Sequence, residues 1–294
     1  AKKLKHLVSK IRVYAIADQD NAGPWIRKTF PDLFYIVSPG YQEFNERGYR
    51  HGTWTGISGE RHYHFPSGAD TSIVGNDWVK NNIHEKGGAL GNEYPFTEYI
   101  MEGDTPSFLY LIDNGLGVPE RPDYGSWGGR YELYTPHYRK FFHQPETRPI
   151  WTNIEDMVIV GNTSYISDQA TIWRWREAFQ NDFAARIQWA VRSYEEANHP
   201  PVVLLNHANQ LTVKGNQEML LDAGKSYDPD GDSLTFHWFL YHEPGSYLLE
   251  GEMMTERYRC FTLNIKDRDK PNASFTAPAV SEPKDMHLIL EVTD

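Results

Sequence analysis

Residues 12–37 read RVYAIADQDNAGPWIRKTFPDLFYIV and predict the fold of the first part of the chain. An apolar strand at residues 12–17 leads into a polar loop, and Pro24 then suits the first turn of a helix that Pro31 ends. A second apolar strand follows at residues 33–37. An apolar strand, a helix and another apolar strand are typical of a parallel pair buried on both faces.

The pattern beyond this unit predicts two domains. Asp168 is expected to cap a helix over residues 169–197, whose apolar side chains recur with helical spacing. The two prolines at 200–201 cannot continue that helix, and the short alternating strands after them are typical of a β-sandwich. We therefore expect an α/β domain with a mostly parallel sheet at residues 1–197 and an all-β sandwich at residues 200–294.

Two stretches of the first domain are expected to be largely irregular. Residues 38–97 are rich in Gly, Asn, Tyr and His, and they predict loops around one short helix near residues 76–85. Residues 115–134 combine Pro, Gly and aromatic side chains, which favours loop. Long irregular segments in a compact domain often build a functional site, and equally they can simply cover the sheet.

Composition excludes some classes of function. The formal net charge of −11 argues against binding to a phosphate backbone, and no apolar run reaches the length of a membrane span. Nine Trp and 14% aromatic residues modestly favour sugar binding, because flat rings serve as stacking surfaces. Cys260 is the single cysteine, so no disulfide forms within the chain, which suits the cytoplasm and equally a bacterial secreted protein.

The start of the sequence resembles the interior of a domain. Residues 1–10, AKKLKHLVSK, have the pattern of the last turns of a basic amphipathic helix and run directly into the strand at residues 12–17. We therefore expect that the N-terminal part of the α/β domain is missing from this chain. The missing half of the domain is then a possible partner, and the first strand would lie at an open edge.

Acidic side chains follow two of the predicted strands. Asp18 and Asp20 come after the strand at residues 12–17, and Glu102 and Asp104 come after residues 99–101. Ligands of open α/β sheets bind outside the carboxyl ends of the strands, so these four carboxylates are candidates for general acid or base catalysis or for Ca²⁺ binding. Their alternative role is to cap the helices that follow.

Several long motifs resemble one family. They are IADQDNAGPWIRKTFPDLFYIVSPG at 16–40, MEGDTPSFLYLIDNGL at 101–116, SWGGRYEL at 126–133 and DQATIWRWREAFQNDFAARIQWAV at 168–191. They are similar to the bacterial cellulose-binding, nucleoside-hydrolase-like family of secreted proteins. The stretch LDAGKSYDPDGDSLTFHWFLY at 221–241 resembles the immunoglobulin-like domain that follows in that family.

The resemblance implies a fold related to ribonucleoside hydrolases, which cleave an N-glycosidic bond with a Ca²⁺ ion and its bound water. Asp104 matches a metal ligand of those enzymes and is the expected ligand here. Gly103 stands where the family usually has His. The Asp-rich cluster that supplies most Ca²⁺ ligands in the family has no match in this sequence, so Ca²⁺ binding by this chain is expected to be weak or absent.

The resemblance also implies a function connected with carbohydrate in a secreted or periplasmic bacterial protein. One expectation is a metal-dependent glycosidic-bond hydrolase that acts on a polysaccharide or a small glycoside. The alternatives are a non-catalytic polysaccharide-binding module and an inactive fragment. The expected substrate contacts are Trp25, Trp54, Trp127 and Arg130.

Overall fold

The computed structural model describes residues 2–16, 22–38, 52–58, 70–100, 102–134, 149–246 and 263–294. The chain divides into two compact units, and each is described by itself. The first comprises Ala1–Lys86 and Gly91–Asn181, and the second comprises Gly87–Leu90 and Asp182–Asp294. The domain boundaries expected from the sequence, 1–197 and 200–294, stay a prediction.

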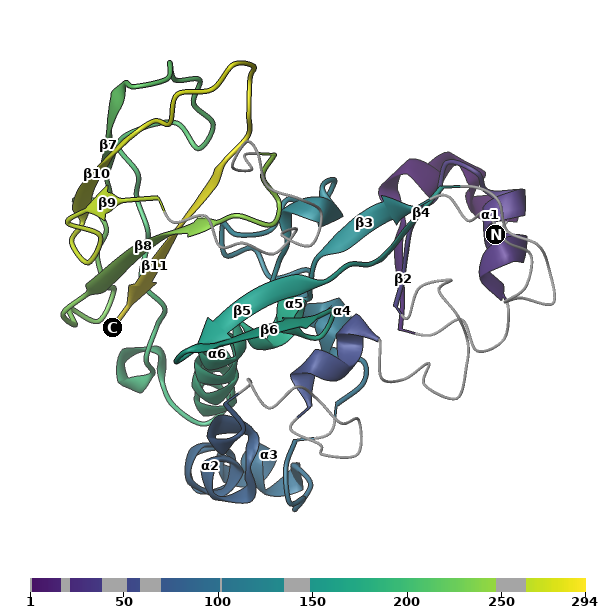
Figure 1. Ribbon diagram of the computed structural model, residues 1–294. Helices are drawn as coiled ribbons and strands as arrows, with labels where there is room; N and C mark the ends of the chain where they lie inside the picture. The colour runs from purple at the N-terminus through teal and green to yellow at the C-terminus, as the bar shows by residue number, and fades with distance from the viewer. Residues whose placement is uncertain are drawn as a thin grey trace. The chain divides into compact units, whose positions relative to one another are not determined.

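The sheet of the first unit is mixed, with parallel strands dominating its described part (Figure 1). After the short helix η1 (Lys2–Lys10), β1 (Arg12–Ala15), α1 (Ala22–Thr29) and β2 (Phe34–Val37) form the predicted strand–helix–strand unit. The strand order is β1-β2-β4-β3, in which β4 (Ile150–Asn153) is parallel to β2 and β3 (Tyr131–Tyr134) is antiparallel to β4. The loop predicted at residues 115–134 therefore ends in a strand.

Both faces of this sheet carry buried side chains. Tyr35, Val37 and Ile150 form one apolar cluster, and Ile36 and Tyr131 belong to another. Alternate residues of β2 thus enter different clusters, because successive side chains of a strand point to opposite faces. This burial explains why β2 is a near-continuous apolar run in the sequence.

The described part of the segment between β2 and β3 contains short helices. They are η3 (Thr53–Ile57), η5 (Ser72–Val74), α2 (Asn76–Val79), η6 (Lys80–His84), α3 (Gly88–Glu93), α4 (Thr105–Leu109) and η7 (Pro122–Tyr124). The short helix predicted near residues 76–85 is confirmed as α2 and the π-helical turn η6. The predicted strand at residues 99–101 is wrong for its described part, because Tyr99 makes only an isolated antiparallel bridge with Gly75.

A β-hairpin and a divided helix follow β4. The hairpin consists of β5 (Asp156–Val160) and β6 (Thr163–Ser167), and the helices are α5 (Ala170–Trp173), α6 (Arg176–Trp189) and η8 (Tyr194–Glu196). The expected continuous helix over 169–197 is therefore wrong, since it breaks at Arg174 and ends at Trp189. Asp168 does not cap it through N2 or N3, because its Oδ1 accepts only the neighbouring Gln169 N–H at 3.0 Å.

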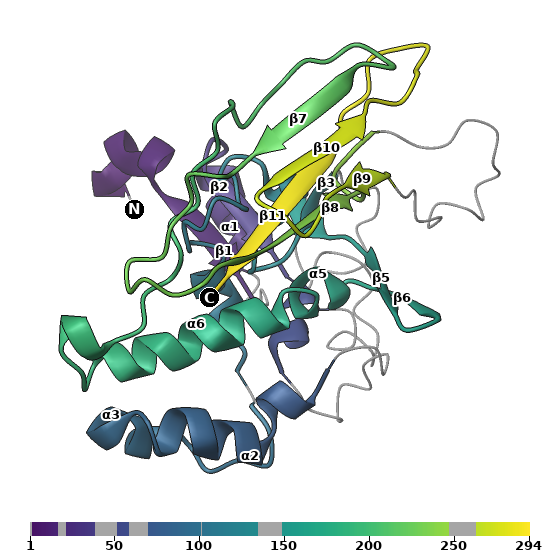
Figure 2. The same cartoon turned by 90° about the vertical axis from the view of Figure 1, so that its left-hand side faces the viewer.

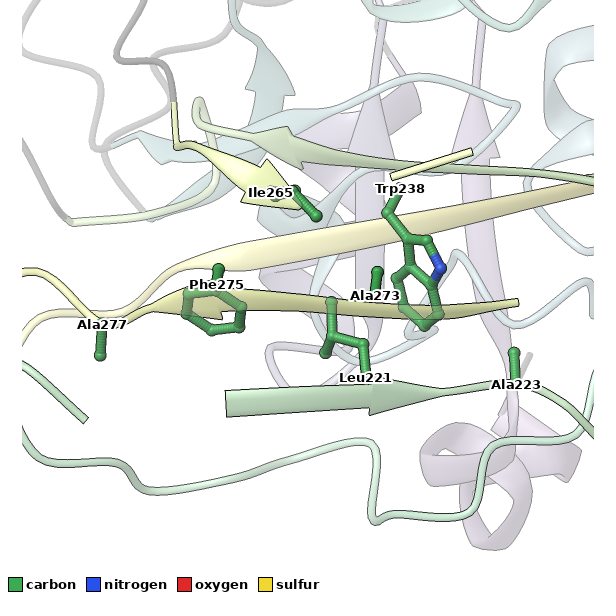
Figure 3. Close-up of a cluster of buried hydrophobic side chains, with 7 residues drawn as sticks. All are labelled: Leu221, Ala223, Trp238, Ile265, Ala273, Phe275 and Ala277. Atoms are coloured by element: carbon green, nitrogen blue, oxygen red, sulfur yellow. The ribbon is translucent and has the colours of Figure 1, made fainter. Parts of the chain in front are cut away.

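The second unit contains two antiparallel sheets around one apolar core (Figures 2 and 3). One sheet has the order β7-β10-β9, from β7 (Glu218–Asp222), β9 (Ile265–Lys266) and β10 (Asn272–Thr276). The other pairs β8 (Thr235–Tyr241) with β11 (His287–Thr293). Trp238 of β8 packs in the same cluster as Leu221 and Phe275 of the first sheet, so the alternating strands predicted in this region are confirmed.

Candidate functional site

The carboxyl ends of β1, β2 and β4 lie at one edge of the sheet, because these strands are parallel. Asp18 and Asp20 follow β1 and lie outside the described residues. The described polar side chains near this edge are Ser38 after β2, Asn153 at the end of β4 and Glu155 beyond it, together with Thr53 and Asp168 from elsewhere in the unit. We call these five residues the edge site.

A chain of hydrogen bonds runs through the edge site. The Thr53 hydroxyl donates to Asn153 Oδ1 at 3.0 Å, and Asn153 Nδ2 donates to Asp168 Oδ2 at 3.4 Å. Asn153 is half-buried, Glu155 is exposed, and Asp168 is only 5% exposed. The site therefore opens to solvent at Asn153 and Glu155 and has a buried carboxyl at its base.

Asp168 is the most perturbed carboxyl group of the edge site. The pKa of Asp168 is raised to about 8, chiefly by burial and to a smaller extent by the negative charge of Glu155, against the lowering effect of the Gln169 N–H. The group is therefore largely protonated at neutral pH. Both hydrogen bonds described for its side chain come from donors, Gln169 N–H and Asn153 Nδ2, so neither of them uses the proton that Asp168 carries.

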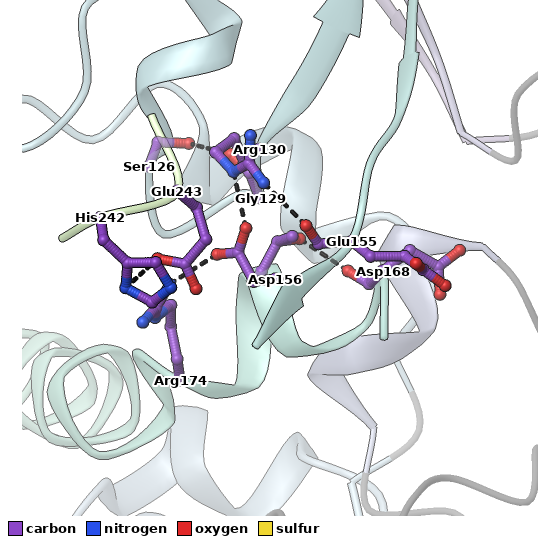
Figure 4. A network of polar contacts seen from close by, with 10 residues as sticks. Ser126, Gly129, Arg130, Glu155, Asp156, Asp168, Arg174, His242 and Glu243 are labelled. Atoms are coloured by element: carbon purple, nitrogen blue, oxygen red, sulfur yellow. Dashed lines mark hydrogen bonds and ion pairs between the residues drawn. The ribbon is translucent and has the colours of Figure 1, made fainter. Parts of the chain in front are cut away.

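A buried ion cluster lies beside the edge site (Figure 4). Asp156 is fully buried, and its two oxygens each accept a guanidinium hydrogen bond at 2.6 Å, one from Arg130 Nε and one from Arg174 Nη1. Arg130 also donates to the Glu155 carbonyl at 2.7 Å. The cluster holds the turn after β4 in place and thereby positions Glu155.

The second acidic loop contacts the edge site through Trp54. A Cβ at Gly103 would lie 3.5 Å from the Trp54 ring, and the backbone N–H of Trp54 donates to Ser38 Oγ at 3.3 Å. Glu102 accepts hydrogen bonds from the hydroxyls of Tyr94 and Thr105, so both of its oxygens have partners. Asp104 is exposed and precedes α4 without a side-chain cap bond.

The expected substrate contacts differ in exposure. Trp25 is 54% exposed on α1, and Trp127 is half-buried in a tight turn closed by reciprocal hydrogen bonds between Ser126 and Gly129. Trp54 is only 8% exposed, so it packs beneath the loop at Gly103 and does not offer the exposed ring that the sequence predicted. Arg130 is 4% exposed and belongs to the buried ion cluster.

The described residues alone do not fit a calcium ion. Ca²⁺ takes roughly six to eight oxygen ligands. Within the part of the chain that the structure describes, no group of three or more His, Cys, Asp or Glu side chains is arranged to hold a metal ion. The expected role of Asp104 as a metal ligand therefore depends on residues outside this part, and it stays a prediction.

Sequence reasoning missed the residues at the centre of the edge site. Asp168 was interpreted only as a helix cap, and Asn153 and Glu155 were not singled out. A weak signal exists, because Asn153 and Glu155 lie at and just after the end of a short strand, as Asp18 and Asp20 follow the strand at residues 12–17. The burial of Asp168 has no such signal, since it arises from contacts between distant segments.

The mixed sheet and the helices of its unit define an α/β protein with a polar site at the carboxyl edge of the sheet. The family model described as cellulose-binding Sde182, nucleoside hydrolase-like domain, matches residues 1–131, and that of cellulose-binding protein Sde0182, C-terminal domain, matches residues 218–294. The two models describe the same cellulose-binding protein family that the sequence motifs resemble, and they match the two ends of the chain. No curated protein sequence matches it.

A solved structure supports the same assignment. It is a nucleoside hydrolase-related hypothetical protein from Saccharophagus degradans that is associated with carbohydrate metabolism, with 30% sequence identity and a TM-score of 0.64. The match covers 99% of this chain and 60% of that chain.

Among the described helices, none combines the length and apolarity that crossing a membrane requires.

Proposed function

We propose that the first unit binds a β-linked polysaccharide, or a short glycoside derived from one, at the edge site. The observation that carries this proposal is Asp168, a buried and largely protonated carboxyl group at the base of a site that opens to solvent. A neutral carboxyl can donate a hydrogen bond as well as accept one, and a sugar hydroxyl needs both kinds of partner. The matches to two family models of cellulose-binding proteins support the choice of ligand.

The same pair of carboxyl groups favours a second candidate, hydrolysis of a glycosidic bond. Asp168 holds a proton at neutral pH, and Glu155 is an exposed carboxylate whose charge acts on it. One protonated carboxyl group and one carboxylate are the acid and base that hydrolysis of a glycosidic bond uses. In this reaction Asp168 would protonate the leaving oxygen, and Glu155 would remove a proton from the attacking water.

Several finer expectations belong with this proposal. Calcium would require ligands such as Asp18 and Asp20 in addition to Asp104, so no step is assigned to it. The second unit is proposed to be an immunoglobulin-like sandwich, on the strength of its two sheets around one core. Secretion or a periplasmic location would bring the protein to its polysaccharide.

Binding to cellulose tests the proposal. The chain is mixed with microcrystalline cellulose, the bound fraction is measured after centrifugation, and binding of cellohexaose is measured by calorimetry. We expect retention of the wild-type chain. The Asn153→Ala variant should bind cellohexaose about 3- to 10-fold more weakly, because one hydrogen-bonding group is lost from the site.

The other outcomes separate the alternatives. Release of reducing ends, lost in the Asp168→Asn variant, would establish hydrolysis, and loss of retention with EDTA would establish a metal requirement. A wild-type chain that neither binds cellohexaose nor remains on cellulose would contradict the binding proposal and support an inactive fragment. Circular dichroism of each variant checks that it is folded.

A further inference from the structure

Phe96 lies in the segment that connects α3 to Tyr99 and is 77% exposed, the highest value among the exposed large apolar side chains that the structure describes. One face of its ring stacks on His84, with ring centroids 4.0 Å apart and an angle of 4° between the planes. The ring is therefore supported on one side and open to solvent on the other. A single exposed apolar residue is ordinary in a protein surface, but the support by a parallel ring is a specific feature of this one.

His84 is itself held in place by its surroundings. It is the last residue of the π-helical turn η6 and is 8% exposed. Tyr94 contacts it edge to face, with centroids 6.4 Å apart. A Cβ at Gly91 would lie 2.1 Å from the Ile83 carbonyl oxygen, so α3 approaches η6 as closely as only glycine permits.

The ring nitrogens of His84 have no hydrogen-bond partner within the described residues. Burying unpartnered polar atoms costs free energy, commonly about 1–3 kcal/mol for each group. The fold thus accepts a cost at this π-helical turn, and such turns are frequent at functional sites. What the imidazole provides in return is a flat surface that fixes the plane of Phe96.

Tyr94 and Glu98, each two residues from Phe96 in the sequence, carry hydrogen-bonding groups. The Tyr94 hydroxyl donates to Glu102, and burial together with the Glu102 charge raises the pKa of Tyr94 far above its usual range. Glu98 is exposed two residues after Phe96. The open apolar face of Phe96 matches a pyranose ring, whose C–H groups form an apolar face and whose hydroxyls project outward.

We propose that Phe96, supported by His84, is a stacking platform for a glucose ring of a β-linked glucan chain. This second contact lies outside the edge site, and it rests on the proposed function. The π face of the phenyl ring is electron-rich and attracts the C–H groups of the sugar. Because Phe96 is already fixed in one plane, little conformational entropy is lost on binding.

Three variants and a matched control test the platform. Phe96→Ala should lower retention on microcrystalline cellulose about 3- to 10-fold, from the loss of one ring contact. Phe96→Trp should retain binding or strengthen it, because it keeps a flat ring. His84→Ala should give an intermediate loss, because Phe96 then loses its support. Phe108→Ala is the control, since Phe108 is an exposed ring on α4, 53% exposed and without a described ring partner.

The results distinguish this inference from the proposed function. If the wild-type chain is retained and Phe96→Ala is retained equally, the platform is wrong and the proposed function stands. An equal loss in Phe108→Ala would also overturn the platform, because general surface apolarity would then explain retention. If the wild-type chain is not retained on cellulose, the platform is wrong, and if it also does not bind cellohexaose, the proposed function fails as well. Cellohexaose binding by folded Phe96→Ala shows that its edge site is intact.

Discussion

At the scale of single residues, Asp168 has the clearest consequence for solution behaviour. Its pKa is raised to about 8 by burial, whereas an unfolded chain holds an aspartate near its usual value of about 4. At a pH between these two pKa values, Asp168 is protonated in the folded state and ionised in the unfolded state. The contribution of Asp168 to stability is therefore complete at acidic pH and falls as the pH rises towards 8.

The Asp168→Asn variant tests this pH dependence. Asn does not titrate, so the free energy of unfolding of the variant should improve relative to wild type from pH 5 to pH 8, by up to about 1.4 kcal/mol per pH unit. Urea unfolding at several pH values measures the difference. A difference that stays constant across this range would show that Asp168 is ionised in the folded protein.

Arg176 shows how one residue organises a loop that the site needs. It is 2% exposed and donates to the carbonyls of Gly56 at 2.8 Å, Ser58 at 3.1 Å and Asp70 at 3.0 Å. Burial lowers the pKa of Arg176 to about 10, which leaves it charged at neutral pH. A charged guanidinium group that donates hydrogen bonds to several carbonyls fixes η3, which contains Thr53 of the edge site and its neighbour Trp54.

At the scale of elements, the ion cluster of Arg130, Asp156 and Arg174 connects the residues before β3, the first residue of β5 and the end of α5. The Arg130 and Asp156 side chains are 5% and 0% exposed, so their charges have little access to water. Removing one member of such a cluster leaves uncompensated buried charge. The free energy of unfolding is therefore expected to fall strongly when the Asp156 carboxylate is removed.

The Asp156→Ala variant should lower the free energy of unfolding by about 3–5 kcal/mol, measured by urea denaturation. The matched control is Asp123→Ala, which breaks the ion pair with Arg121 at 2.6 Å, where the side chains are 32% and 47% exposed. That change should cost about 1 kcal/mol or less. Equal losses in the two variants would contradict the role assigned to the buried cluster.

At the break between α5 and α6, long-range contacts outweigh a local sequence pattern that favours a continuous helix. The residues around Trp175 carry no proline or glycine, and their spacing favours a continuous helix. The Arg174 side chain instead donates a hydrogen bond to Asp156, and the Arg176 side chain donates to the carbonyl of Gly56. Between them, the backbone N–H of Trp175 donates to the Ile172 carbonyl, in the tighter i to i−3 pattern. These long-range bonds offset the cost of interrupting the helix.

At the scale of the whole molecule, each compact unit has apolar clusters of its own. The cluster of the second unit centres on Trp238, which is 3% exposed and whose indole N–H donates to the Lys270 carbonyl at 3.1 Å (Figure 3). A buried Trp fills a large volume that neighbouring side chains cannot close. The stability of the second unit should therefore depend strongly on this residue.

The Trp238→Ala variant should destabilise the second unit by about 3–5 kcal/mol. Hydrogen exchange of the amides in β7, β8 and β10 measures the loss as faster exchange. The control is Tyr227→Ala in the same unit, where the ring is 52% exposed and little should change. Unchanged exchange in Trp238→Ala would show that the core does not depend on this side chain.

The sequence by itself determined the strand–helix–strand unit at residues 12–37, the alternating strands of the second unit and the similarity to a cellulose-binding family. These features are encoded locally, in periodicity, prolines and contiguous motifs. Only the tertiary structure decided that β3 and the hairpin of β5 and β6 form, that the helix after Asp168 is divided, and that Trp54 is buried. The physical reason is that these outcomes depend on partners distant in the chain, as when Arg176 bonds a carbonyl 120 residues away.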